Sequence, residues 1–286
     1  MKTTTTTLPP PETLRTPAPR LPHWLRRLHR EQSALTWAGW LHAALLLLAL
    51  ALLPFDERTV TGLNVWIKPI KFSVAGLVYV WSLAYLLTDL PAAAGRSARR
   101  VGRVVALALT VEISCVYLQA ARGTTSHFNM NSVFDMMVFN VMGLFILANT
   151  LAIVWALGLV FRHRPLGSAA WVWGIRLGLL VFLVGSAVGG SMSARLAHTV
   201  GAADGGAGLP FLGWSTRHGD LRAAHFLGLH ALQALPLLGW LLTRAFPRLR
   251  PAAQTALVLL GTLLYCAAVS WLYWHALQGL PLWAGR

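Results

Sequence analysis

Residues 34–53 read ALTWAGWLHAALLLLALALL, a stretch of twenty residues without a single Asp, Glu, Lys or Arg. At a rise of about 1.5 Å per residue, a helix of this length crosses the roughly 30 Å of hydrocarbon in a bilayer. A helix also satisfies its own backbone hydrogen bonds, which surrounding lipid cannot do. This stretch therefore predicts a transmembrane helix.

Six further apolar blocks of about this length follow along the chain. Their apolar residues run continuously instead of alternating with polar ones, which favours helices over the strands of a barrel. The predicted fold class is an all-α integral membrane protein with seven transmembrane helices in one domain, residues 34–286. The expected spans are about 34–53, 65–87, 104–121, 133–155, 170–191, 222–242 and 256–277.

The composition excludes a soluble protein. Of the 286 residues, 56% are hydrophobic and only 12% are charged, and the mean hydropathy is +0.58. The 24 Lys and Arg against 9 Asp and Glu give a formal charge of +15, which on its own would suggest a nucleic-acid partner. Because the basic residues lie mostly in short connections between apolar blocks, we expect the lipid bilayer as partner and no nucleic acid.

The basic residues also predict the orientation. If alternate connections face alternate sides, fifteen basic residues lie on the side of the N-terminus and eight on the other, with Arg176 inside the fifth span. The positive-inside rule then predicts a cytoplasmic N-terminus and an extracytoplasmic C-terminus. A composition rich in Ala, Leu and Arg suggests the plasma membrane of a bacterium. Residues 1–33 are predicted to be a disordered Thr- and Pro-rich basic tail in the cytoplasm, in which residues 23–32 could form an interfacial helix.

Unusual polar residues are concentrated in the connections predicted to face outward, at 64–71, 122–135 and 192–221. The last of these contains five glycines between 201 and 213 together with Pro210. We therefore expect an irregular or re-entrant lid there rather than a folded domain. The functional site is predicted on the extracytoplasmic side.

The stretch RGTTSHFNMNSVFDMM at 122–137 combines His127, Asn129 and Asp135 with soft sulfur atoms. Imidazole with thioether suits Cu(I) or a haem iron, and imidazole with carboxylate suits zinc. His127 is thus a candidate metal ligand, Asp135 a candidate catalytic residue and Asn129 a candidate substrate-binding residue. In the alternative interpretation, Asp135 only complements the positive N-terminus of a capped helix and the Met side chains only pack.

A second polar cluster begins the sixth span. His218, His225 and His230 lie within thirteen residues, together with Asp220 and Arg222. At 100° per residue, the last two histidines are about 140° apart around a helix, so they bind one ion only if another helix contributes. The three histidines are candidate metal ligands and Asp220 is a candidate catalytic residue. Hydrogen-bonded structural roles are the alternative.

Glu112 lies near the middle of the third predicted span. A carboxylate at that depth is costly and by default functional, so Glu112 is a further candidate catalytic residue. By its depth, it could exchange a proton with His230 or His42, or pair with Arg176. A buried structural glutamate, hydrogen-bonded to a neighbouring helix, is the alternative.

Basic residues at the predicted outer face could hold an anion. Lys68 and Lys71 are three residues apart at the start of the second span and point the same way, and Arg122 and Arg222 lie at the mouths of two other spans. Together they are candidate ligands for a phosphate or carboxylate, such as an anionic lipid headgroup. Snorkelling of each side chain to the headgroup region is the alternative.

No Walker, HExxH, dinucleotide-binding, serine-elbow or CxxCH motif occurs, so three hypotheses stay open. In the first, a divalent metal such as zinc activates water for hydrolysis of an anionic lipid or lipid-linked substrate. In the second, histidines hold haem or copper for electron transfer. In the third, the protein is a proton-coupled transporter or sensor that uses Glu112 and His230.

Overall fold

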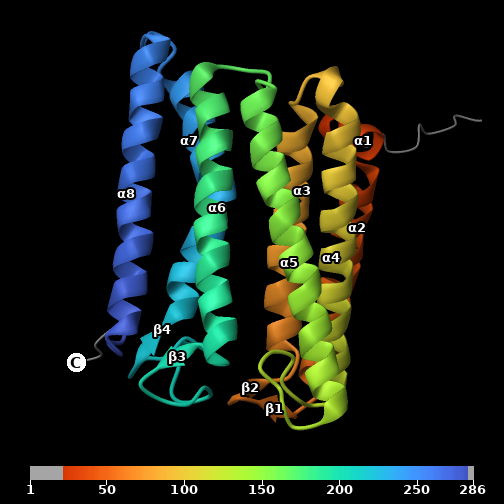
Figure 1. Cartoon of the computed structure of the whole chain (residues 1–286). Helices are drawn as coiled ribbons and strands as arrows, with labels where there is room; N and C mark the ends of the chain where they lie inside the picture. Colours follow the sequence, from red (N-terminus) through yellow and green to blue (C-terminus); the bar gives the residue numbers. More distant parts are fainter. Residues whose placement is uncertain (1–21, 283–286) are drawn as a thin grey trace, which may run out of the picture.

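The computed structural model describes residues 22–282. Within these residues, seven helices are long and apolar enough to cross a membrane, which confirms the predicted all-α membrane fold with seven transmembrane helices (Figure 1). The elements in chain order are α1 (His23–Glu31), α2 (Ser33–Leu52), η1 (Leu53–Phe55), β1 (Thr59–Val60), β2 (Leu63–Asn64), α3 (Ile67–Thr88), η2 (Ala92–Ala94), α4 (Gly95–Ala121), α5 (Val133–Arg162), α6 (Ala169–Arg195), β3 (Thr199–Val200), β4 (Gly219–Asp220), α7 (Leu221–Ala245) and α8 (Pro251–Leu277).

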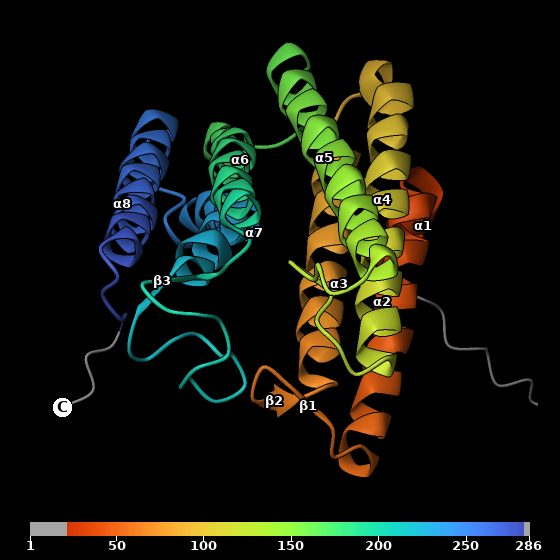
Figure 2. The same cartoon turned by 60° about the horizontal axis from the view of Figure 1, so that its bottom comes forward.

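The seven long helices stand side by side in two groups (Figures 1 and 2). The first group contains α2, α3, α4 and α5, the second contains α6, α7 and α8, and α5 contacts α6 where the groups meet. The short helix α1 packs against the first group at one end of the bundle, and the strands and long loops lie at the other. We call these the α1 end and the loop end.

Several helices extend beyond the spans predicted from hydropathy, chiefly at the α1 end. Helix α4 begins at Gly95, nine residues before the predicted span, and α5 continues to Arg162, seven residues past it. These extensions carry arginines, which hydropathy windows exclude. A helix tolerates them once it projects into the headgroup region.

Helix α1 forms where an interfacial helix was predicted. Leu25 and Leu28 are buried, whereas Arg26 and Arg30 are exposed. Arg27 ties α1 to the end of α3, with 3.3 Å between its Nη1 and Oδ1 of Asp89. Residues 1–21, the rest of the predicted tail, lie outside the described part of the chain.

The largest buried hydrophobic cluster joins both groups of helices through residues such as Leu35, Leu83, Val101, Ile153 and Leu179. Many other large apolar side chains on the long helices are exposed, as expected for surfaces that contact lipid. The core is therefore a narrow strip between helices. Polar side chains inside the bundle are exceptions in this apolar setting.

Helices α6 and α7 pack backbone to backbone. A Cβ atom at Gly185 would lie 2.6 Å from the backbone of Gly228, so only glycine fits this contact. Small residues allow such close approach of helices in lipid, where packing rather than the hydrophobic effect holds helices together. The contact fixes α7, whose first turns carry Arg222 and His225.

Three connections meet at the loop end: the β1–β2 hairpin, residues 122–132, which we call the α4–α5 loop, and residues 196–220, which we call the lid. Within the lid, β3 pairs with β4 in antiparallel register. Nζ of Lys71 on α3 donates a hydrogen bond to the Leu212 carbonyl at 2.9 Å, and Leu63 of the hairpin lies against Gly213. The lid is therefore anchored to the start of α3 and to the hairpin.

Candidate functional site

The structure brings three predicted site residues together: Glu112 of α4, His127 of the α4–α5 loop and Lys68 of α3. Nε2 of His127 lies 3.3 Å from Oε1 of Glu112, and Nδ1 of the same ring lies 3.3 Å from Nζ of Lys68. Glu112 precedes the end of α4 by nine residues, about 14 Å along the helix. The α4–α5 loop therefore folds back into the bundle and places His127 beside a mid-helix carboxylate.

Only one carboxylate oxygen of Glu112 has a polar neighbour. The residue is 4% exposed, and its Oε2 is the one buried side-chain nitrogen or oxygen without a hydrogen-bond partner in residues 22–282. Buried polar atoms are nearly always paired, because an unpaired one costs about 1–3 kcal/mol, and more when it is charged. Oε2 thus marks a place where a proton, a water molecule or a ligand would be stabilised.

The surroundings of His127 determine where its proton lies. The ring centroids of Phe72 and Phe128 lie 5.6 and 6.0 Å from that of His127. Burial lowers the pKa of His127, and the charge of Lys68 adds to this effect while Glu112 opposes it. Nδ1 faces the Lys68 ammonium group, which only donates, and the Ser126 hydroxyl at 3.0 Å, which can donate, so both contacts favour the neutral tautomer with its proton on Nε2, toward Glu112.

Asp135, Arg122 and Asn129 shape the loop that carries His127. Asp135 pairs with Arg122 and also accepts hydrogen bonds from Gln119 and Ser132. The Ser132 hydroxyl accepts from the backbone N–H of Asp135 and so caps α5. The buried Asn129 bonds to other residues of the same loop. The hydrogen bonds of these predicted catalytic and substrate-binding residues are therefore made within the protein.

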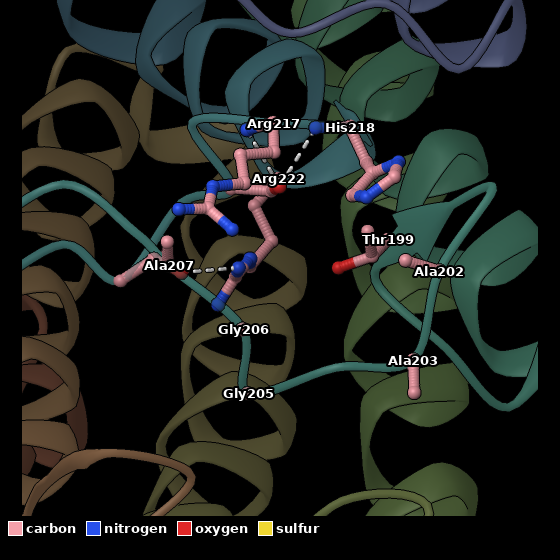
Figure 3. A pocket seen from close by; sticks show the side chains of 11 residues that line it. Thr199, Ala202, Ala203, Gly205, Gly206, Ala207, Arg217, His218 and Arg222 are labelled. Atoms are coloured by element: carbon pink, nitrogen blue, oxygen red, sulfur yellow. Dashed lines mark hydrogen bonds between the residues drawn. The ribbon is translucent and has the colours of Figure 1, made fainter.

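Asp220, Arg222 and Lys71 position the lid. Arg222 reaches both carboxylate oxygens of Asp220, at 2.9 Å from Nε to Oδ1 and 2.6 Å from Nη2 to Oδ2, and also the Gly213 carbonyl. Asp220 caps α7 by accepting from the backbone N–H of Arg222. Lys71 holds the lid from α3. His218 lies with Arg222 in the wall of a small cavity inside the lid (Figure 3).

The two remaining predicted metal ligands contact different neighbours. Nδ1 of His225 lies 2.8 Å from the Gly185 carbonyl of α6, and Nδ1 of His230 lies 2.9 Å from the Phe226 carbonyl of its own helix. In the part of the chain that the structure describes, no three His, Cys, Asp or Glu side chains lie close enough to hold a metal ion. The four predicted histidine ligands thus contact different partners and form no metal-binding group within the described residues.

The three residues predicted as partners of Glu112 bond to other groups. His42 bonds to a carbonyl of its own helix, and Arg176 donates to the Val160 carbonyl at 3.0 Å. Among the described residues, the polar side chain in contact with Glu112 is that of His127, whose other ring nitrogen faces Lys68. Matching depth along separate helices does not fix which face each residue occupies, so depth alone indicated His42, His230 and Arg176 and could not indicate His127.

His198 and Asp204 of the lid were not predicted as site residues. Nδ1 of His198 lies 2.6 Å from Oδ2 of Asp204, and its ring centroid lies 4.7 Å from that of Phe128 in the α4–α5 loop. Burial lowers the pKa of His198, and the hydrogen bond to Asp204 opposes this. Burial would raise the pKa of Asp204, but hydrogen bonds from His198 and from Thr199 hold it well below its usual range. A His and an Asp six residues apart carry no distinctive sequence signal.

Comparisons with protein-family models, curated proteins and solved structures found no match for this chain. Function is therefore argued from the site. The site offers a buried carboxylate with one unpaired oxygen, an imidazole beside it and an ammonium group from the first turn of α3.

Proposed function

We propose that the protein is a proton-coupled transport protein in which Glu112 takes up and releases a proton through His127. The observation that carries this proposal is the buried, unpaired Oε2 of Glu112, with Oε1 3.3 Å from Nε2 of His127. Ionisable groups at mid-membrane depth are costly and are typical of proton relays. His127 replaces His230 as the partner of Glu112 in the predicted proton path.

The three side chains form a balanced relay. Nε2–H of His127 gives its proton to Oε1 of Glu112 while Nδ1 takes a proton from Lys68, so the imidazole stays neutral and changes tautomer. Lys68 then regains a proton from the loop end. Once Glu112 is protonated, its Oε1–H donates to the bare Nε2 of His127, so the hydrogen bond between α4 and the α4–α5 loop reverses direction and loses its charge. The protonation of Glu112 is thereby linked to how strongly α4 holds the loop.

The relay faces the loop end, which we infer to be extracytoplasmic. Arginines are concentrated at the α1 end, in α1, at the start of α4 and around the α7–α8 connection. The positive-inside rule places that end in the cytoplasm, with α1 at the surface of an anionic leaflet. The composition supports the plasma membrane of a bacterium as the location.

A metal-dependent hydrolase of anionic lipids and a haem or copper redox protein remain alternatives. Either would require His127, His218, His225 or His230 to recruit ligands beyond their present neighbours. Stoichiometric zinc, copper or haem in the purified protein would support them over the proton relay.

Infrared difference spectroscopy on the full-length protein in detergent tests the proposal. When the pH is lowered, we expect the carbonyl band of a protonated carboxylic acid to be present in the wild type and to be missing in Glu112→Gln. Glu57→Gln, which removes an exposed acid at the same end, is the matched control. A wild-type spectrum equal to that of Glu112→Gln at every pH would overturn the proposal.

A further inference from the structure

The lid encloses a small cavity beside the first turn of α7. Its volume is about 150 Å³, and its polar wall is formed by Thr199, Ser215, Arg217, His218 and Arg222. Figure 3 shows Arg217 and Arg222 on one side of the open space, with Thr199 and the small residues Ala202 and Ala203 on the other. At about 30 Å³ per water molecule, the cavity has room for about five waters or one compact solute.

Hydrogen-bond donors predominate in this wall. A guanidinium group has five N–H donors, and Arg222 uses three of them on Asp220 and Gly213. The two on Nη1 make no hydrogen bond within residues 22–282. The side chain of Arg217 likewise makes none with the described residues. Two arginines thus have donors left for a ligand.

Two hydroxyl groups add to these donors. Oγ of Ser215 accepts from the backbone N–H groups of Arg217, at 3.3 Å, and His218, at 3.0 Å, which leaves its own proton free to donate. The Thr199 hydroxyl points into the cavity from the opposite side (Figure 3). Donors therefore face the cavity from both sides.

The charge of the wall is positive. No Asp or Glu is among the described residues that line the cavity. Two carboxylates lie next to lining residues, and both have partners: that of Asp220, with a side chain only 1% exposed, is bonded to Arg222 and to the backbone of Ser215, and that of Asp204 to His198 and to the backbone of Thr199. A small space with two guanidinium groups and two hydroxyl donors suits an oxyanion, because charge-assisted hydrogen bonds from arginine match its geometry.

We propose that this cavity binds a compact oxyanion, phosphate or a short carboxylate, as the outer site for the solute that is transported with the proton. Lys71 contacts the lid beside Arg222. Lys68, one helical turn before Lys71 on α3, contacts His127 of the relay. Basic side chains thus connect the cavity to His127 and Glu112. The role in transport rests on the proposed function, whereas the binding of an oxyanion does not.

Isothermal titration calorimetry of the full-length protein in detergent tests this inference, with inorganic phosphate and acetate as separate probes. We expect one site per chain, and binding about ten to a hundred times weaker in Arg217→Ala, because one charge-assisted contact is lost. Arg195→Ala removes an exposed arginine at the end of α6 outside the cavity and is the matched control. Binding of phosphate alone or of acetate alone would identify the source of the oxyanion.

A second variant distinguishes a loss of binding from a folding defect in the lid. Thr199→Val preserves the shape of a β-branched side chain and removes only the hydroxyl, so it should weaken the same binding while thermal unfolding stays unchanged. No binding of either probe, or equal weakening in Arg217→Ala and Arg195→Ala, would overturn the inference. Failure of the proton relay would show separately, in the infrared spectra of Glu112→Gln.

Discussion

At the scale of single residues, the lid and the α4–α5 loop meet through aromatic and ionisable side chains. His198 contacts Phe128 on one side and Asp204 on the other, while His127 contacts Phe128 from within the bundle. Burial lowers the pKa of both histidines, because it disfavours the imidazolium form. The junction between lid and loop therefore favours neutral imidazoles.

Acidification should loosen the lid. Burial lowers the pKa of His198 below its unfolded value of about 6.5, with Arg222 and Lys68 adding to this effect and Asp204 opposing it. A histidine whose pKa is lowered by folding contributes stability that is complete above about pH 6.5 and is lost as the pH falls from there toward the folded pKa. Hydrogen exchange of residues 196–220, corrected for intrinsic rates, should show less protection in mildly acid solution than at neutral pH.

The variant His198→Gln should remove this pH dependence, because an amide does not titrate in that range. His163→Gln, at the α1 end, replaces a histidine far from the lid and should leave the dependence intact. If exchange in the lid proved equally pH-dependent in His198→Gln and in the wild type, His198 would not be the responsible group.

At the scale of helices, close packing of α6 on α7 holds the lid in place, because the lid runs from the end of one helix to the start of the other. The contact depends on glycine at Gly185, whereas Gly190, on the same helix, has nothing within 4 Å of the position of a Cβ atom. The two glycines thus have different roles on one helix.

Gly185→Ala should destabilise the protein by about 1–3 kcal/mol, because the new methyl group forces α6 and α7 apart. Gly190→Ala should be neutral or stabilising by up to about 1 kcal/mol, since alanine is the better helix former. Unfolding by sodium dodecyl sulfate, followed by circular dichroism, measures both. Equal midpoints for the two variants would show that the close contact contributes little to stability.

At the scale of the whole molecule, the two ends differ in chemistry. The α1 end has short basic connections, and the loop end has the relay, the lid and the oxyanion cavity. Charge asymmetry of this kind orients membrane proteins during insertion. The inferred direction of proton entry depends on this orientation.

Reporter fusions should show the loop end outside. Alkaline phosphatase fused after Arg286 should be active and green fluorescent protein at the same place dark, while the same reporters within residues 246–250 should give the opposite result. A fluorescent C-terminal fusion would contradict the predicted orientation and would place the lid in the cytoplasm.

The fold follows from local patterns, whereas the site depends on how distant segments meet. Seven continuous apolar runs suffice to predict seven helices, because each helix satisfies its backbone hydrogen bonds within one segment. Glu112 could be identified as a candidate site residue for the same reason, since the free-energy cost of a carboxylate in the membrane depends on its depth in a single span. The pairing of Glu112 with His127 could not be read from spacing, because Glu112 lies about 14 Å before the end of α4 and the α4–α5 loop must turn back toward it for the two side chains to meet.

The choice among histidines was likewise decided by packing. His127, His218, His225 and His230 are equivalent as residue types, and a helical wheel separates only the last two. Which of them meets a carboxylate depends on loop path and helix rotation: the α4–α5 loop brings His127 to Glu112, whereas the close packing of α6 on α7 brings His225 to the Gly185 carbonyl. The oxyanion cavity has the same origin: its arginines are visible in the sequence, but the space between them exists only because the lid closes on itself through β3 and β4.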